Sequence, residues 1–188
     1  IKSLLWHTTN IGVMPNLVSV AGGEYLNNEL DLGAVAEDIE ASVKKYEPER
    51  HPALLIKFNQ DGATVMLFSS GAYNIAGASS IEQLHDTHRH LAETIESMLN
   101  TEIKYEEKCE VRNLIYVDDY GSSVDLEKLI TVLGIENIEY EPETFPSLDY
   151  RSPHNEGVFK IFSTGKIIMT GETNTDTIDE AFNQLKND

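Results

Sequence analysis

With 188 residues, 40% of them hydrophobic, the chain can bury one sizeable core or the cores of two fused halves, and its apolar runs are too short for a membrane-spanning helix of roughly 20 residues. A single cysteine, Cys109, excludes an internal disulfide and a metal site built from cysteines, and it suits a reducing cytoplasm. Thirty-two acidic and fourteen basic residues give a net charge of −18, the wrong sign for binding nucleic acid at ordinary salt.

The first half of the chain predicts a strand, a short helix, three short strands and a long helix. The strands are expected at residues 16–20, 54–58, 64–68 and 73–76, and a tight turn is expected at Asp61-Gly62. The short helix is expected to begin at Asp31 and to carry one apolar face of Val35, Ile39 and Val43. The long helix is expected to begin with Ser79 and Glu82 as a capping box and to bury a stripe of Ile81, Leu84, His88, Leu91, Ile95 and Met98.

The second half predicts the same order of elements. Its strands are expected at residues 114–117, 147–151, 158–162 and 167–170. A helix carries Leu126, Leu129 and Leu133 on one face. The closing helix is expected to begin with Thr177 and Glu180 as its capping pair and to bury Ile178, Phe182 and Leu185.

The two halves also repeat each other residue by residue, at a constant spacing of 94 residues. Tyr46-Glu47-Pro48 returns as Tyr140-Glu141-Pro142, residues 68–71 return at 162–165, and Gly77 returns as Gly171. This unit is longer than the 20–50 residues of a solenoid repeat, so we infer a tandem duplication of two half-domains. The expected fold is α+β, a curved antiparallel sheet with helices on its convex face. A pseudo-twofold protein is suited to a ligand of similar symmetry, such as duplex DNA.

One face of the predicted sheet is left without helices. Alternation along the strands puts Thr64, Met66 and Phe68 on one face, with Val158, Lys160 and Phe162 in the equivalent places, and points Leu67 and Ile161 toward the helices. Phenylalanines on their own would suit a buried core, but this alternation places them on the uncovered face. An apolar surface of that size indicates a binding site.

Three segments resemble the TATA-box-binding protein family in its archaeal form: residues 140–151 (YEPETFPSLDYR), 162–171 (FSTGKIIMTG) and 68–77 (FSSGAYNIAG). The resemblance covers about residues 14–186, as two repeats at 14–102 and 110–186. It implies a pseudo-twofold saddle whose concave sheet binds the minor groove of an A/T-rich promoter, bends the DNA, and recruits transcription factor B and, indirectly, RNA polymerase. Residues 1–13 match no family feature.

The resemblance also assigns candidate DNA-binding residues. Wedges between base steps are implied at Phe68, Phe145 and Phe162, and the fourth wedge position holds His51. Groove-floor contacts are implied for two asparagines and for apolar or hydroxyl side chains near them: Asn16, Val18, Met66, Asn113, Ile115, Val158, Ile168 and Thr170. Phosphate contacts are implied for Lys57, Arg151 and Lys166, and contacts with transcription factor B for Glu141, Glu143 and Thr144.

Five positions depart from the family pattern in ways that bear on DNA binding: His51, Ala72, Asn74, Asp149 and Lys160. His51 is a more strongly hydrated wedge than phenylalanine. Ala72 removes a cation, since it occupies the position equivalent to Lys166. The other three make the groove face more polar than is usual in the family. These departures leave the fold intact but put the promoter preference in question.

The acidic charge leaves two functional hypotheses open. In molar salt the Debye length falls to about 3 Å, so a salt-adapted promoter factor could still bind DNA. Alternatively, the chain is a paralogue that has lost DNA binding and serves as a protein-interaction module. An apolar sheet face could also pair two copies of the chain as a homodimer without DNA.

Catalysis, cofactors and metals are not expected. The sequence has no phosphate-binding loop or nucleophile motif, and Cys109 has no recognisable histidine partner. His85, His88 and His90 resemble a metal cluster, but His90 points away from the other two on a helix. We therefore expect a cytoplasmic, nucleoid-associated protein that is not an enzyme.

Overall fold

The structure, a computed structural model, describes residues 15–153 and 155–187. The chain forms two compact units. The first unit is Val18–Arg112, and the second unit joins Asn113–Asp188 to the segment that ends at Leu17. The expectation that residues 1–13 match no family feature lies outside the described residues.

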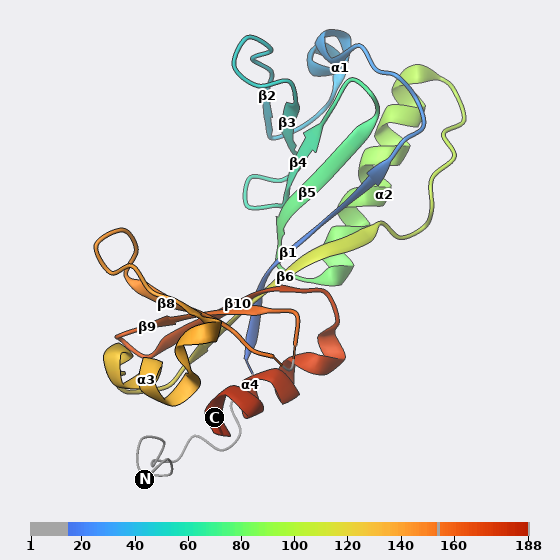
Figure 1. The fold of residues 1–188 in the computed structure, drawn as a ribbon. Coiled ribbons are helices and arrows are strands. Elements are labelled where there is room, and N and C mark those ends of the chain that lie inside the picture. The colour runs from blue at the N-terminus through green and yellow to red at the C-terminus, as the bar shows by residue number, and fades with distance from the viewer. Residues whose placement is uncertain (1–14, 154, 188) are drawn as a thin grey trace. The chain divides into compact units, whose positions relative to one another are not determined.

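The first unit is a five-stranded antiparallel sheet with two helices (Figure 1). Along the sheet the strand order is β2-β3-β4-β5-β1. Its strands are β1 (Asn16–Tyr25), β2 (Val43–Lys45), β3 (Leu54–Lys57), β4 (Thr64–Leu67) and β5 (Ala72–Ala78). Asn16 and Leu17 of β1 belong to the second unit. Its helices are α1 (Leu32–Asp38) and α2 (Ile81–Leu99).

The second unit repeats this arrangement (Figure 1). Its strand order is β6-β10-β9-β8-β7, again antiparallel. The strands are β6 (Glu110–Asp119), β7 (Ile138–Glu139), β8 (Ser147–Arg151), β9 (Val158–Phe162) and β10 (Lys166–Glu172). Residues 110–112 of β6 belong to the first unit. The helices are α3 (Leu126–Leu133) and α4 (Ile178–Asn187), with short 3-10 turns η2 (Ile135–Asn137) and η3 (Thr175–Thr177).

The hairpins between the last two strands of each repeat have the same backbone geometry. The amide of Gly71 donates to the carbonyl of Phe68, and the amide of Gly165 donates to the carbonyl of Phe162, both at 2.9 Å. Gly71 has φ +86° and Gly165 has φ +95°, a conformation that L side chains rarely adopt. A Cβ on Gly71 would lie 2.3 Å from a backbone oxygen of Asn28. The repeated glycine is therefore required twice by the same turn.

Each sheet buries one face against its helices. In the first unit, helix α2 packs Leu84, Leu91 and Ile95 against the sheet, and all three are fully buried. In the second unit, Phe182 of α4 meets Phe159 of β9 edge to face, with ring centroids 5.3 Å apart. The helices thus lie on the face toward which Phe159, and Tyr73 in the first unit, point.

A buried histidine joins helix α2 to the sheet and to the segment that follows the helix. Burial raises the pKa of the Tyr73 phenol, so its hydroxyl stays protonated and donates to Nδ1 of His88. The other ring nitrogen of His88, Nε2, then carries the hydrogen and donates to the carbonyl of Glu106 at 2.6 Å. His88 was expected in the buried stripe of α2 and lies there, fully buried.

Three local predictions were wrong, each at the end of a helix. Helix α1 ends at Asp38 and Val43 lies in strand β2, which the sequence did not predict. Helix α2 is capped one residue later than expected: Ser80 accepts from the amide of Gln83, whose side chain reaches back to Ser79. In the last helix Asn174, and not Thr177, supplies the cap, because a 3-10 turn precedes α4.

The predicted fold class is confirmed at the level of each unit: α+β, two tandem repeats, antiparallel strands, and helices on one face of each sheet. Strands β8 and β9 have the predicted bounds, whereas β1 and β6 are longer than predicted. None of the helices in the described part of the chain has the length and apolar character needed to cross a membrane.

Candidate functional site

Each sheet has a second face, opposite the helices, which we call the open face. In the first unit, the inward side chains of Val65, Leu67 and Ile75 are completely buried, while their neighbours on the same strands are partly exposed. The same alternation separates Phe159 and Ile161 from the outward residues of β9. The outward side chains on the two open faces include Lys57, Thr64, Met66, Phe68, Ala72, Asn74 and Ala76 in the first unit, and Asn113, Ile115, Asp149, Arg151, Val158, Lys160, Phe162, Lys166, Ile168 and Thr170 in the second.

The wedge positions lie on two kinds of turn. Phe68 and Phe162 begin the glycine hairpins and are partly exposed. His51 and Phe145 end equivalent turns: His51 donates its amide to the carbonyl of Glu47, and Phe145 donates to that of Glu141, each at 2.9 Å. Residue 51 is therefore the structural counterpart of Phe145, which is 51% exposed.

His51 is held differently from Phe145. Its Nδ1 accepts a hydrogen bond from the amide of Ala53 at 3.1 Å, and its ring lies 6.5 Å from that of Phe68, tilted by 43°. Phe145 instead has the ammonium of Lys160 at 5.4 Å from its ring centroid, a cation–π contact. The imidazole of His51 is therefore hydrogen-bonded within its own turn, whereas the phenyl ring of Phe145 contacts a side chain from a neighbouring strand.

The asparagine of the second unit is oriented by its neighbours. Oδ1 of Asn113 accepts from the Thr170 hydroxyl at 3.0 Å and from the Gly171 amide at 2.9 Å. Both hydrogen bonds go to the oxygen. The Nδ2 donors of Asn113 bond to no described residue and are therefore available to a ligand. Asn16 and Val18, on β1, are both exposed, and Val18 is 48% exposed.

Charge on the open faces differs from that of the whole chain. On the outward positions of β3, β4, β5, β8, β9 and β10, all of which are described, Asp149 is the one acid, and its carboxylate forms an ion pair with Lys160. Lys57, Arg151 and Lys166 form no ion pair with any described residue. On the neighbouring strands, Asp119 lies opposite Lys166 at the start of β10, Glu139 lies opposite Asp149 in the middle of β8, and Glu110 of β6 forms an ion pair with Arg112. The outward positions of these six strands therefore carry more cations than acids, on a chain of charge −18.

The sequence did not predict a role for Arg112, and the structure places it on the open face of the first unit. Its Nη1 donates to Oδ1 of Asn74 at 2.8 Å and its Nε donates to Glu110 at 3.0 Å. Asn74 was noted as a departure from the family pattern, and Arg112 stands directly before Asn113. These two features of the sequence could have drawn attention to Arg112 and Asn74, but the contact between them becomes evident only from the pairing of the strands.

The residues implied in partner contacts lie on the turn that precedes Phe145. Glu141, Glu143 and Thr144 are all exposed. The carbonyl of Glu141 accepts from the amides of Thr144 and Phe145, which fixes the backbone and leaves the side chains in solvent.

One sequence inference about Cys109 was wrong: a histidine does lie beside it. Its Sγ is 3.8 Å from Nδ1 of His85. Burial, however, raises the pKa of the Cys109 thiol to about 11, and burial together with the nearby Lys108 lowers the pKa of His85. The thiol therefore stays protonated at neutral pH, and the neighbouring imidazole does not activate it. Across the described residues, no group of three or more histidine, cysteine or acidic side chains is placed to hold a metal ion.

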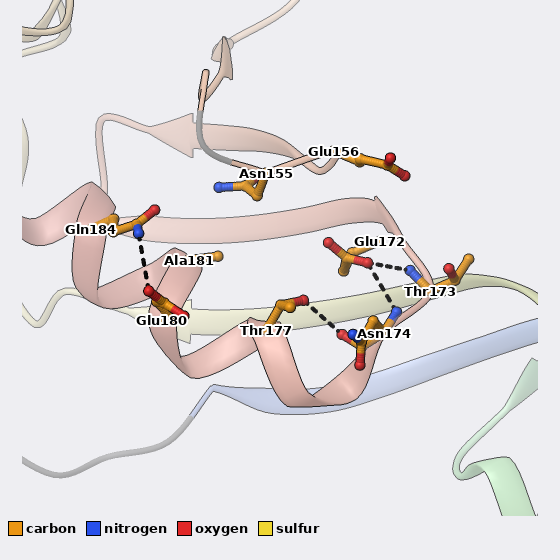
Figure 2. A pocket seen from close by; sticks show the side chains of 9 residues that line it. All are labelled: Asn155, Glu156, Glu172, Thr173, Asn174, Thr177, Glu180, Ala181 and Gln184. Atoms are coloured by element: carbon orange, nitrogen blue, oxygen red, sulfur yellow. Dashed lines mark hydrogen bonds between the residues drawn. The ribbon is translucent and has the colours of Figure 1, made fainter.

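A hollow of about 430 Å³ opens in the second unit, beside helix α4 (Figure 2). Glu172, which lines it, accepts hydrogen bonds from the amides of Thr173 and Asn174, both at 2.9 Å. Figure 2 shows the side chains of Glu180 and Gln184 on α4 on another wall of this hollow. The buried carboxylate thus holds the turn between β10 and η3, which gives the hollow a structural explanation.

Two sheets of equivalent strands, each with helices on one face and polar, apolar and aromatic side chains on the other, define a duplicated α+β protein with a sheet-based binding surface. A solved structure, Methanococcus jannaschii TBP, has this fold, with a TM-score of 0.74 and 27% identity, and the match covers 93% of this chain and 97% of that one. The family described as "Transcription factor TFIID (or TATA-binding protein, TBP)" matches residues 14–98 and 108–187.

Curated relatives agree with this assignment. The chain is 33% identical to the TATA-box-binding protein of the halophile Haloarcula marismortui over 90% of this chain and 88% of the relative. It is 32% identical to that of Thermoplasma volcanium over 89% and 90%. The chain therefore belongs to the TATA-binding protein family, whose members are general transcription initiation factors and not enzymes.

Proposed function

We propose that the two open faces bind the minor groove of A/T-rich promoter DNA and bend it. The observation that carries this proposal is the distribution of charge: the outward positions of β3, β4, β5, β8, β9 and β10 include one acid, and three of their cations form no ion pair with a described residue. In this proposal Lys57, Arg151 and Lys166 meet phosphates, because lysine and arginine neutralise them and release counterions.

The apolar and amide side chains read the groove. Asn113 offers its Nδ2 donors to the N3 of adenine or the O2 of thymine, and Asn16 takes the equivalent role. Apolar contact at a groove floor disfavours the guanine amino group. This role falls to Val18, Met66, Ile115, Val158 and Ile168, with Thr170 orienting Asn113.

Four side chains act as wedges between base steps: His51, Phe68, Phe145 and Phe162. Unstacking a base step costs a few kcal/mol, which burial of the wedge and of the sheet face offsets. The His51 turn is the weaker wedge, since its imidazole is hydrated and already accepts a hydrogen bond from Ala53.

The protein further recruits transcription factor B through the exposed Glu141, Glu143 and Thr144, and RNA polymerase follows indirectly. Carboxylates on a rigid turn suit a basic patch on a partner and add more to specificity and association rate than to affinity. In the cell this places the protein on the nucleoid.

Fluorescence anisotropy tests the DNA-binding step. A labelled duplex with a TATA sequence and a scrambled control of equal composition are titrated at 0.1 to 2 M KCl. Selective binding is expected, with a slope of log affinity against log salt no steeper than about −3 for three phosphate contacts. Energy transfer between dyes on the two duplex ends measures the bend. Equal affinity for both duplexes at every salt concentration would overturn the proposal.

The alternative, a protein-interaction module of the same fold, is favoured by one observation. Asp149 and Lys160 form an ion pair on the open face, where the family usually has apolar groove contacts. If this alternative is correct, neither duplex binds and the open faces pair with protein. A homodimer without DNA would appear as a doubled mass in light scattering at low salt.

A further inference from the structure

Arg112 lies on the same open face as Asn74. Strand β1 pairs with β5 so that Gly22 lies opposite Ile75 and Gly23 opposite Asn74. Ile75 is completely buried and points toward the helices, so Gly23 and Asn74 face the other way. A Cβ on Gly23 would lie 3.0 Å from Nη1 of Arg112. The guanidinium of Arg112 therefore packs over the backbone of Gly23, in space that a side chain at this position would occupy.

The guanidinium is fixed at two points and still has donors to offer. Asn74 holds Nη1 and Glu110 holds Nε. Arginine has five N–H donors, so three remain after these two bonds, and the Arg112 side chain is 46% exposed. A planar cation held in this way has already lost much of its rotational freedom, which lowers the entropic cost of a further contact.

The position of Asn74 decides which part of the duplex the guanidinium would meet. Strand β5 has β4 on one side and β1 on the other, so Asn74 lies within the sheet and not on its edge strand. Phosphates line the two rims of a groove, whereas the interior of a sheet laid on the groove faces the base edges.

We infer that Arg112, positioned by Asn74, is a specificity-determining residue that donates to the base acceptors of the minor-groove floor. This inference rests on the proposed function. Adenine N3 and thymine O2 accept such donors, but the guanine amino group is itself a donor and occupies the same space. Arg112 therefore favours A·T over G·C at the base pair it meets. In this case Asn74, although polar where the family is usually apolar, contributes to base recognition by positioning Arg112.

Inosine separates this effect from all others. An I·C pair and a G·C pair differ in the minor groove only by the guanine amino group. Duplexes are made in which one A·T pair at a time of the TATA site is replaced by I·C or by G·C. The ratio of the two dissociation constants at each position measures the discrimination against that amino group, with DNA sequence context held constant.

The wild-type protein should show a ratio well above one at several positions. Arg112→Met should lower that ratio about tenfold at one position and leave the others unchanged. Asn74→Val should lower it at the same position by a smaller factor, about threefold, because the guanidinium is kept but no longer held. Lys104→Met removes an exposed cation from the segment after α2 of the same unit and should change no ratio.

Three outcomes overturn the inference. Unchanged ratios in Arg112→Met would do so, and so would a uniform weakening with a salt slope reduced by about one, which marks a phosphate contact. A lowered thermal midpoint of Asn74→Val with unchanged ratios would overturn the positioning role of Asn74, because that residue would then only stabilise the fold. A wild-type protein that does not select the TATA duplex would instead overturn the proposed function itself.

Discussion

His51 and Phe145 show how one side chain changes the chemistry of an otherwise repeated turn. Their backbones make the same hydrogen bond to the glutamate four residues before, yet one tip is an imidazole bound to its own turn and the other a phenyl ring in contact with Lys160. An imidazole loses more hydration on entering a base stack than a phenyl ring does, so the two turns contribute unequally to any wedging.

His51→Phe should therefore strengthen binding to the TATA duplex. Replacing a hydrated ring by an apolar one of similar size adds about 1 kcal/mol of burial, or roughly fivefold in affinity. The bend measured by energy transfer should increase with it. Phe145→His is the matched control and should weaken both. If His51→Phe leaves affinity and bend unchanged, His51 is not a wedge.

Cys109 gives a prediction that is independent of DNA. With its pKa raised by burial from 9.0 to about 11, the thiolate fraction at pH 8 is about a hundredfold smaller than that of an unperturbed thiol. Alkylation of the native protein by iodoacetamide should be slower by at least that factor than alkylation in denaturant. The native rate should continue to rise with pH up to about 11.

The same shift has a consequence for stability. The folded protein holds the thiol proton more tightly than the unfolded chain, so this contribution is complete below pH 9 and is lost as pH rises from 9 to about 11. Burial of the Tyr73 phenol acts in the same direction at still higher pH. A free energy of unfolding from urea titrations that rises across this range would contradict both assignments.

At the scale of elements, the glycine hairpins hold the most tightly specified geometry. Gly71 and Gly165 have positive φ, and a Cβ on either would lie 2.2–2.3 Å from a backbone oxygen, which cannot move aside as a side chain could. Gly77, also at positive φ, has open space around its Cβ direction. Comparing alanine substitutions at these three glycines therefore distinguishes the cost of backbone strain from the cost of steric overlap.

Gly71→Ala and Gly165→Ala should each lower the free energy of unfolding by about 2–4 kcal/mol, since strain and overlap combine. Gly77→Ala should cost only the strain, about 1 kcal/mol. Urea titration followed by circular dichroism measures all three. Equal losses at Gly71 and Gly77 would mean that the close approach to Asn28 contributes nothing.

The sequence predicted these elements well where a periodic pattern extends over many residues. It failed where a boundary depends on one or two neighbouring residues. The repeat located both hairpins, and alternation gave the bounds of β8 and β9, because both patterns extend over many residues. The start of α2 was misplaced because Ser79 and Ser80 are equally good caps, and the backbone geometry chooses Ser80. Strand β2 is three residues long and each of its residues is exposed, so it leaves no hydrophobic pattern.

The candidate site was predictable only as far as the family pattern reached. The wedge, asparagine and lysine positions follow from aligned motifs, and whether they contact DNA remains a prediction. Arg112 follows from no motif, because its position depends on the pairing of Gly23 with Asn74 across two strands. The Cys109–His85 contact likewise joins residues 24 apart through folding alone.

At the scale of the whole molecule, most of the negative charge lies on helices, turns and strand ends, and Asp149 is the one acid on the outward positions of β3, β4, β5, β8, β9 and β10. Self-repulsion of a chain with a net charge of −18 weakens the folded state at low ionic strength. Salt shortens the Debye length from about 10 Å at 0.1 M to about 3 Å at 1 M and so removes most of this repulsion.

The thermal midpoint should therefore rise by several degrees between 0.1 and 1 M KCl. Differential scanning calorimetry measures the shift. A variant with Glu82→Gln, Glu93→Gln and Glu127→Gln loses three exposed helix charges and should show a smaller rise. An identical rise in both proteins would mean that salt acts by some route other than screening.

The two long turns have a common backbone but different tips, Arg50-His51 in one repeat and Thr144-Phe145 in the other. A duplicated protein with identical halves would bind a non-palindromic duplex equally well in both orientations. Here the tips differ in charge and in aromatic character, so the two orientations would differ in free energy. If the two turns act as the proposed wedges, this difference would give the molecule a polarity, and a promoter, which must be read in one direction, is a ligand that could use it.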